Sequence, residues 1–150
     1  MDLNGEEFIP APRERVWEML NDPEILRQCI PGCETLEQAE PDQFSAEVVL
    51  KIGPVKARFN GEVFIKDKNF PDGYRIEGEG KGGIAGFASG GADVILKEQE
   101  DGTLLEYRVD ANVGGKIAQL GSRLITSTSK KLAGQFFGKF SELAAQAQTA

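Results

Sequence analysis

The chain has 150 residues, a net charge of −7 and a hydrophobic content of 40%, with nine phenylalanines. A chain of this length and composition can bury a sizeable core, so we expect one globular domain over residues 1–150. The acidic balance argues against a general nucleic-acid binder, because phosphate contacts need basic patches. The sequence contains no histidine, which excludes Ser–His–Asp and Cys–His catalysis and removes the commonest zinc ligand.

The first thirty residues predict one strand followed by two short helices. The opening segment is typical of a short strand, with Leu3, Phe8 and Ile9 as its expected core contacts. A proline then precedes an amphipathic helix, RERVWEMLND. An Asp-Pro pair starts a second short helix, PEILRQC, and a Pro-Gly pair ends it.

Residues 34–115 alternate between apolar and polar side chains, as antiparallel strands with one buried face do. The clearest alternation runs through FSAEVVLKI and VKARFNGEVFI, which a Gly-Pro turn joins into a predicted hairpin. Turn signals at residues 71–73 and 101–102 separate the later strands. With the first segment included, we expect six to seven antiparallel strands.

The C-terminal region changes period again. From Lys116 to about Ala147 there is no proline, and apolar residues recur at helical spacings, which predicts one long helix of about 45 Å. We therefore predict an α+β fold. A curved antiparallel sheet would wrap around the long C-terminal helix, with two short helices after the first strand.

Glycines concentrate between residues 78 and 91, where seven occur within fourteen positions. In antiparallel strands glycine marks bends or close approach, so this segment is either a flexible hairpin or a lip over an apolar ligand. The run GEGKGG fits a dinucleotide fingerprint, but no βαβ unit surrounds it, and we expect no cofactor. Gly134 and Gly138 indicate either close packing of the predicted helix on the sheet or an apolar space between them.

Cys29 and Cys33 flank a Pro-Gly pair and are the two cysteines of the chain. Without histidine or further cysteines they cannot supply four zinc ligands, so we expect no metal. Their spacing also differs from the C-x-x-C of thiol oxidoreductases, although a reversible disulfide stays open. The favoured interpretation is that both are structural thiols.

Acid–base chemistry without histidine would need Glu77, Asp93 or Tyr107. Glu77 and Glu79 fall on the polar side of a predicted strand, which favours a solubilising role. A cyclase or hydrolase that uses an interior cavity is the enzymatic alternative. It requires one of these groups to point inward.

The net charge is unevenly distributed, at −11 for residues 1–115 and +4 for residues 116–150. Lys116, Arg123 and Lys130 recur every seven residues, so they would lie on roughly one side of the predicted helix. This face is either simply solvated or docks an acidic partner or an anionic membrane.

Three segments carry a resemblance to a known family: FIPAPRERVWEMLNDPEILRQCIPGCETLE, GGIAGFASGGADVIL and GGKIAQLGSRLI. They resemble the carbon monoxide dehydrogenase G-subunit (CoxG) family. That family is part of the helix-grip (SRPBCC) superfamily, with START lipid-transfer domains and the birch-pollen allergen. The resemblance implies an apolar cavity between sheet and helix. It also implies an accessory role beside a molybdenum hydroxylase, with membrane recruitment and binding of a quinone-like lipid.

We therefore expect a non-enzymatic binder of a hydrophobic small molecule, with Tyr107 as its polar contact. The sequence has no visible signal peptide and no membrane-spanning stretch, which predicts a cytoplasmic protein. The resemblance implies peripheral contact at the inner face of the membrane. The expected cavity lining consists of Phe44, Val48, Phe59, Val63, Ile76, Phe87, Tyr107, Val109, Leu120 and Leu124.

Overall fold

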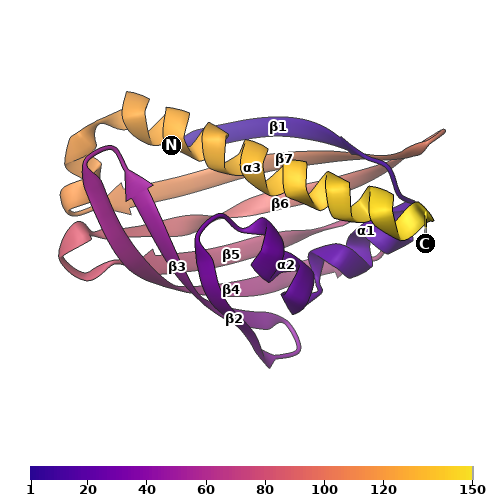
Figure 1. Cartoon of the computed structure of the whole chain (residues 1–150), viewed down its shortest axis with the longest axis horizontal. Coiled ribbons are helices and arrows are strands. Elements are labelled where there is room, and N and C mark those ends of the chain that lie inside the picture. The colour runs from indigo at the N-terminus through magenta and orange to yellow at the C-terminus, as the bar shows by residue number, and fades with distance from the viewer. Residues whose placement is uncertain (150) are drawn as a thin grey trace.

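The computed structural model describes the backbone of residues 1–149 and the side chains of residues 1–146. Within these residues, seven strands form one antiparallel sheet in the order β1-β7-β6-β5-β4-β3-β2 (Figure 1). The elements in chain order are β1 (Asp2–Ile9), α1 (Arg13–Leu20), α2 (Pro23–Cys29), β2 (Cys33–Glu40), β3 (Gln43–Ile52), β4 (Val55–Asn69), β5 (Gly73–Lys81), the 3₁₀ helix η1 (Gly83–Ala85), β6 (Phe87–Gln99), β7 (Gly102–Gly114), the 3₁₀ helix η2 (Lys116–Leu120) and α3 (Ser122–Thr149).

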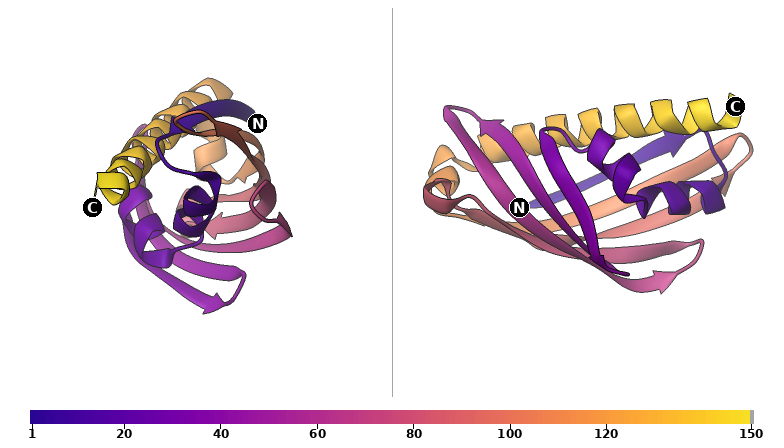
Figure 2. Two further views of the ribbon diagram at one scale, coloured as in Figure 1. Left: turned by 90° about the vertical axis from the view of Figure 1, so that its right-hand side faces the viewer. Right: turned by 60° about the horizontal axis from the view of Figure 1, so that its bottom comes forward.

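The sheet curves strongly, and α3 lies along its concave side (Figure 2). β1 pairs with β7 at one edge, while β2 forms the other edge beside β3. α1 and α2 connect these two edges and lie at one end of the sheet. The predicted α+β fold, a curved sheet around a long helix, is confirmed.

The strands keep the predicted period of two, with one correction in β1. The β3–β4 hairpin forms at its predicted turn, where Ile52 pairs with Val55. In β1, Leu3 and Ile9 are buried as expected, but Phe8 is 47% exposed. The core role predicted for Phe8 is wrong, because neighbouring residues of a strand point to opposite faces and Ile9 takes the inner one.

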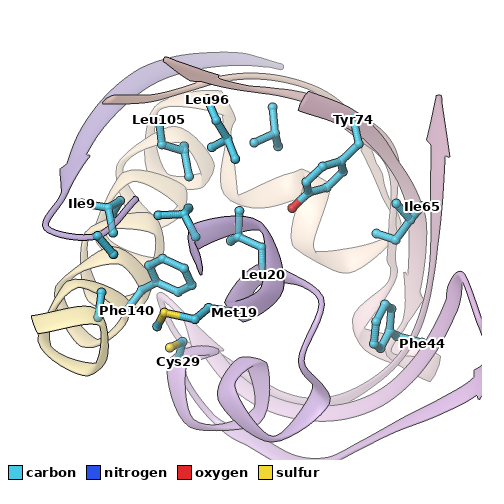
Figure 3. Packing of buried hydrophobic residues seen from close by; sticks show 14 residues of the cluster. Ile9, Met19, Leu20, Cys29, Phe44, Ile65, Tyr74, Leu96, Leu105 and Phe140 are labelled. Carbon is cyan, nitrogen blue, oxygen red and sulfur yellow. The ribbon is translucent and has the colours of Figure 1, made fainter. Parts of the chain in front are cut away.

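The main core lies where α1, α2 and the C-terminal half of α3 meet the sheet. Ile9, Met19 and Phe140 have no exposed surface, and Figure 3 shows them pointing into a common interior. The buried Thr103 hydroxyl donates a hydrogen bond of 2.7 Å to the Ala11 carbonyl. That bond fixes the connection between β1 and α1 and leaves the hydroxyl satisfied in the core.

The long helix begins later than predicted. Residues 116–120 form the separate 3₁₀ helix η2, and α3 starts at Ser122. Gly115 and Gly121 flank η2 with φ angles of +77° and +93°, a region that glycine enters without the steric cost of a Cβ. A continuous helix from Lys116 is therefore wrong, although the 28 residues of α3 still span about 42 Å.

The two helix glycines singled out by the sequence face solvent. Gly134 and Gly138 are exposed, and a Cβ built at either position meets no atom within 4 Å. They neither pack closely on the sheet nor border an interior space. Both interpretations drawn from these glycines are wrong, because they lie on the side of α3 that faces away from the sheet.

Replacement of these glycines should stabilise the protein. Gly134→Ala and Gly138→Ala are each expected to raise the free energy of unfolding by about 0.5–1 kcal/mol, since alanine loses less backbone entropy in a helix. Urea denaturation followed by circular dichroism measures this change. Gly121→Ala is the matched control and should destabilise, because the φ of Gly121 is +93°. An unchanged or lowered free energy for Gly134→Ala would contradict the expectation.

Candidate functional site

An apolar cavity of about 440 Å³ lies between the sheet and α3. It is bordered by β3, by the α2–β2 connection, by η2 and by one face of α3. No titratable side chain of the described residues lines it. The lining residues are Ile30, Pro31, Val48, Leu50, Ile52, Phe59, Gly61, Gly80, Ala88, Ile117, Leu132, Ala133 and Phe136.

The cavity exists because small residues meet across the centre of the sheet. The strand register places Ala46 opposite Gly61, Gly61 opposite Gly80, and Gly80 opposite Ala88. A Cβ built at Gly80 meets no atom within 4 Å. This row supplies almost no side-chain volume, so the space below α3 stays unfilled.

The predicted lining residues divide among three places. Val48 and Phe59 line the cavity itself. Leu120 packs against a second apolar cluster, which includes Ile117 of η2. Leu124 lies against Gly53 of the β3–β4 turn. The remaining inward-facing residues belong to the main core or to the inner face beside it: Phe44, Val63, Ile76, Tyr107 and Val109.

Phe87 does not face the cavity. It is 50% exposed, and its ring covers Gly114 on the outer face of the sheet. Ala88 lines the cavity instead, so the alternation of β6 turns Phe87 outward. The prediction that Phe87 borders the cavity is wrong. The glycines around Phe87 have no side chains, so the sequence does not show which residues of this strand point inward.

Several lining residues were missed by sequence reasoning. Leu132 and Phe136 lie on the apolar side of α3, so the helical spacing of apolar residues was a signal that could have identified them. Ile30 and Pro31 come from the α2–β2 connection, where no periodic pattern exists to place them. The Gly61–Gly80 pair depends on strand register, which a single sequence does not fix.

Tyr107 points inward but lies next to the core rather than in the cavity. Its ring stacks on Phe137 of α3, with centroids 5.4 Å apart and planes 16° apart. Burial, and then the negative charge of Glu7, raise the pKa of the Tyr107 phenol above its usual value. The hydroxyl therefore stays protonated at neutral pH and can donate a hydrogen bond.

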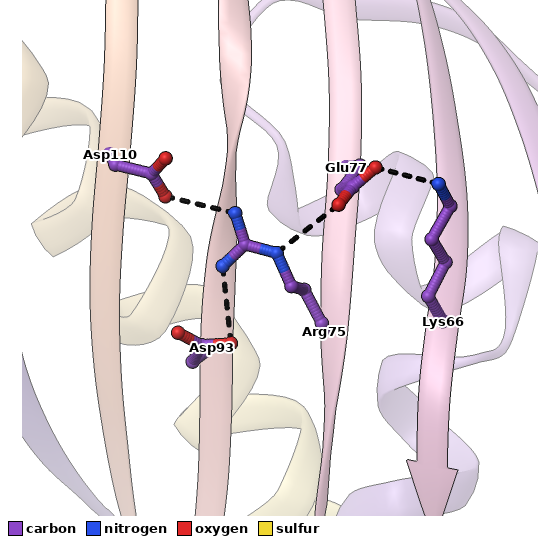
Figure 4. A network of polar contacts seen from close by, with 5 residues as sticks. All are labelled: Lys66, Arg75, Glu77, Asp93 and Asp110. Carbon is purple, nitrogen blue, oxygen red and sulfur yellow. Dashed lines mark hydrogen bonds and ion pairs between the residues drawn. The ribbon is translucent and has the colours of Figure 1, made fainter.

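The carboxylates considered for catalysis lie on the outer face of the sheet (Figure 4). Arg75 donates to Glu77, and its guanidinium lies 3.2 Å from Asp93 and 3.1 Å from Asp110. Lys66 donates to Glu77 at 2.7 Å, and this bond is the main reason that the pKa of Glu77 is lowered. Neither carboxylate reaches the cavity, so an acid–base enzyme working there would lack both.

A larger hollow of about 780 Å³ crosses the outer face near this network. Charged groups border it, among them Arg75, Asp93, Glu106 and Arg108. Arg75 pairs with Asp93, and Glu106 pairs with Lys97 on the adjacent strand, as solvated surface charges commonly do. The apolar cavity beneath α3 is the better candidate site, since its lining residues are all apolar or glycine.

Both cysteines are free thiols near the α2–β2 corner. Cys29 is buried in the main core, and Figure 3 shows its sulfur beside Met19. Cys33 is half-buried and donates to the Thr35 carbonyl at 3.3 Å. Burial raises the pKa of Cys29 to about 11, although the charge of Lys139 opposes the shift. These surroundings suit the structural interpretation.

Thiol alkylation should distinguish the folded chain from the unfolded chain. Because the thiolate is the reactive form, a pKa near 11 instead of 9.0 should slow iodoacetamide at Cys29 about a hundredfold at neutral pH. The rate should rise with pH up to about 11. Peptide mass spectrometry with and without urea measures it, with half-buried Cys33 as the faster internal reference. Equal rates for Cys29 in both states would contradict this expectation.

The three basic residues predicted to share one helix face are all exposed. Lys116 lies in η2, while Arg123 and Lys130 lie on α3. Within residues 1–146, none of them has an ion-pair partner. Seven-residue spacing still places Arg123 and Lys130 on one side of α3. Lys116 does not belong to that face, because Gly121 separates it from the helix.

The sequence places this architecture in a family. The family model of CoxG, the G-subunit of carbon monoxide dehydrogenase, matches residues 5–145. The chain belongs to the CoxG family. The recognition drawn from three sequence segments is therefore confirmed. No curated protein matches the chain.

Solved structures extend this family assignment to the fold. A conserved protein from Geobacillus kaustophilus is 32% identical, with a TM-score of 0.92, and the match covers 98% of this chain and 97% of that one. A START superfamily protein from Mycobacterium smegmatis has a TM-score of 0.73 at 13% identity, covering 97% and 98% of the two chains. Ara h 8.0201 has a TM-score of 0.66 at 13% identity, covering 97% and 98%. The last two matches show the helix-grip fold alone.

Within the part of the chain that the structure describes, every helix is too short or too polar to pass through a lipid bilayer.

Proposed function

We propose that this CoxG-family chain binds a hydrophobic small molecule, an isoprenoid quinone or a lipid, without catalysing its conversion. The observation that carries the proposal is the 440 Å³ cavity, whose lining residues are all apolar or glycine. Such a site favours a ligand that gains from leaving water and needs no charged contact. The small residues Gly61, Gly80 and Ala88 give room for an apolar chain beneath α3.

The proposal explains why the cavity lacks acid–base groups. Glu77 and Asp93 are held in ion pairs on the outer face, and Tyr107 stacks on Phe137. The cyclase or hydrolase alternative has no carboxylate of the described residues at the cavity to act as acid or base. The Tyr107 hydroxyl lies against Gly5 of β1 and outside the cavity lining, so we assign the ligand no polar contact there.

Solvent extraction followed by mass spectrometry tests ligand binding. Purified protein should release a stoichiometric hydrophobic compound, and delipidated protein should bind menaquinone or ubiquinone. Protein that carries no lipid and binds neither quinone would contradict the proposal. Conversion of the added quinone during the assay would favour the enzymatic alternative instead.

Membership of the family supports an accessory role as the second part of the proposal. The protein would recruit a carbon monoxide dehydrogenase-type molybdenum hydroxylase to the inner face of the membrane, with Arg123 and Lys130 meeting acidic groups of that enzyme. Both side chains are exposed and lack ion-pair partners among the described residues. The double variant R123E/K130E should lose capture of the purified hydroxylase. Undiminished capture would remove this docking face from the proposal.

A further inference from the structure

One end of the molecule gathers three connections that are distant in the sequence. The β3–β4 turn, the β5–β6 connection with η1, and η2 all lie at this end (Figure 2, right). A second apolar cluster holds them together, formed by the buried residues Val55, Phe59, Ala85 and Ile117. We call this end the η1 end.

The η1 end projects an apolar side chain into solvent. Ile84 is 93% exposed, the highest value among the exposed large hydrophobic residues of the described chain. Gly83 and Gly86, with φ angles of +60° and +116°, form the tight turn on either side of it. Ala85 is buried and anchors the turn, while Phe87, 50% exposed, follows on the outer face. The turn therefore presents Ile84 to solvent.

The η1 end also lacks negative side chains, although the whole chain is acidic. No aspartate or glutamate occurs in residues 48–61, 80–92 or 111–141. These segments contain the three connections and the strand ends that support them. Carboxylates concentrate elsewhere, so the chain of net charge −7 carries a basic end.

Three of the four lysines of the η1 end lack a carboxylate partner among the described residues. Lys51 and Lys56 lie directly opposite each other in the β3–β4 ladder, an arrangement that costs stability because like charges repel. Within residues 1–146 neither they nor Lys116 has a carboxylate within 4 Å, and Lys81 has one only at 3.9 Å, from Glu79. Apart from Lys130 and Lys131 in α3, the remaining lysines each have a carboxylate partner: Lys66, Lys68, Lys97 and Lys139.

We infer that the η1 end docks on an anionic lipid surface, with Ile84 entering the boundary between headgroups and acyl chains. The lysines around it would meet lipid phosphates, each adding to the attraction within a Debye length of the membrane. An apolar projection inside a basic rim is the combination that interfacial membrane binders use. An acidic protein could form ion pairs with the lysines, but it would also need an apolar pocket at the position of Ile84.

The position of the cavity indicates why the protein would dock at this end. This step rests on the proposed function, the binding of a hydrophobic ligand. Phe59 and Ile117 belong both to the cavity lining and to the cluster beneath the η1 end. The cavity therefore lies directly behind the proposed docking surface, so a ligand exchanged with the bilayer would have only a short distance to cover. The protein would exchange its ligand with the membrane without carrying it through water.

Co-sedimentation with vesicles tests the inference, using the full chain and phosphatidylcholine vesicles with or without phosphatidylglycerol. The wild type should bind the phosphatidylglycerol vesicles, and salt should weaken that binding. Ile84→Asp should weaken it about tenfold, from the lost apolar burial. K56E/K81E should weaken it about tenfold or more. Charge reversal at position 56 replaces the repulsion from Lys51 by an attraction, which offsets the loss of the exposed Lys81–Glu79 pair, so we expect the variant to fold.

Ile95→Asp is the matched control, because Ile95 is 47% exposed on the outer face away from the η1 end. It should bind vesicles like the wild type. Quinone binding by Ile84→Asp should be unchanged, which separates this inference from the proposed function. Absence of wild-type vesicle binding, or equal loss in Ile84→Asp and Ile95→Asp, would overturn the inference. Loss of hydroxylase capture in K56E/K81E without any vesicle binding would also overturn it, in favour of an acidic protein.

Discussion

Gly80→Leu is expected to abolish most hydrophobic-ligand binding while leaving the protein at least as stable as the wild type. The position points into the cavity, a Cβ there meets no atom within 4 Å, and its φ lies outside the left-handed region. The four added carbons would displace about four methylenes of the ligand. At about 0.8 kcal/mol each, this amounts to about 3 kcal/mol, or roughly a hundredfold in Kd.

Stability should move in the opposite direction. Leucine fills existing space beside Gly61 and Ala88 and does not force neighbouring residues apart. The free energy of unfolding should therefore rise by about 0.5–2 kcal/mol. Quinone titration and urea denaturation measure the two effects on the same preparation. Gly134→Leu is the matched control, since that glycine is exposed on α3 and its replacement should leave ligand binding unchanged. Wild-type affinity in Gly80→Leu would show that the cavity is not the ligand site.

The spacing of apolar residues is sufficient to predict the fold, because strands repeat every two residues and helices about every 3.6. The alternation through β3 and β4 correctly placed Val48 and Phe59 on the inner face. The family motifs then agreed with the architecture that the periods imply. Alternation fails where side chains are missing, and Phe87 was assigned to the wrong face within the glycine-rich stretch for that reason.

The cavity itself depends on relations between elements that no local pattern contains. Gly61 and Gly80 are nineteen positions apart in the chain, and they face each other only because the β4–β5 ladder has one particular register. The break at Gly121 likewise changes which part of the C-terminal segment covers the sheet. Leu120 and Leu124 therefore lie toward the η1 end, and Phe136 lines the cavity instead.

Phe140→Ala is expected to be the most destabilising single truncation that we consider, at about 3–5 kcal/mol. Phe140 has no exposed surface and joins α3 to the main core. Its ring stacks on Phe136, with centroids 5.9 Å apart and planes 13° apart. The loss would be a large fraction of the total stability of an ordinary domain.

The same truncation links core packing to the site. Phe136 lines the cavity, so removal of the ring on which it stacks should loosen that wall and weaken ligand binding as well. Phe87→Ala is the matched control, because the same side chain at 50% exposure should cost less than about 1 kcal/mol. Urea denaturation of both variants, with and without bound ligand, compares them. A cost below about 1 kcal/mol for Phe140→Ala would mean that α3 is held on the sheet by contacts other than this core, and that the cavity wall does not depend on it.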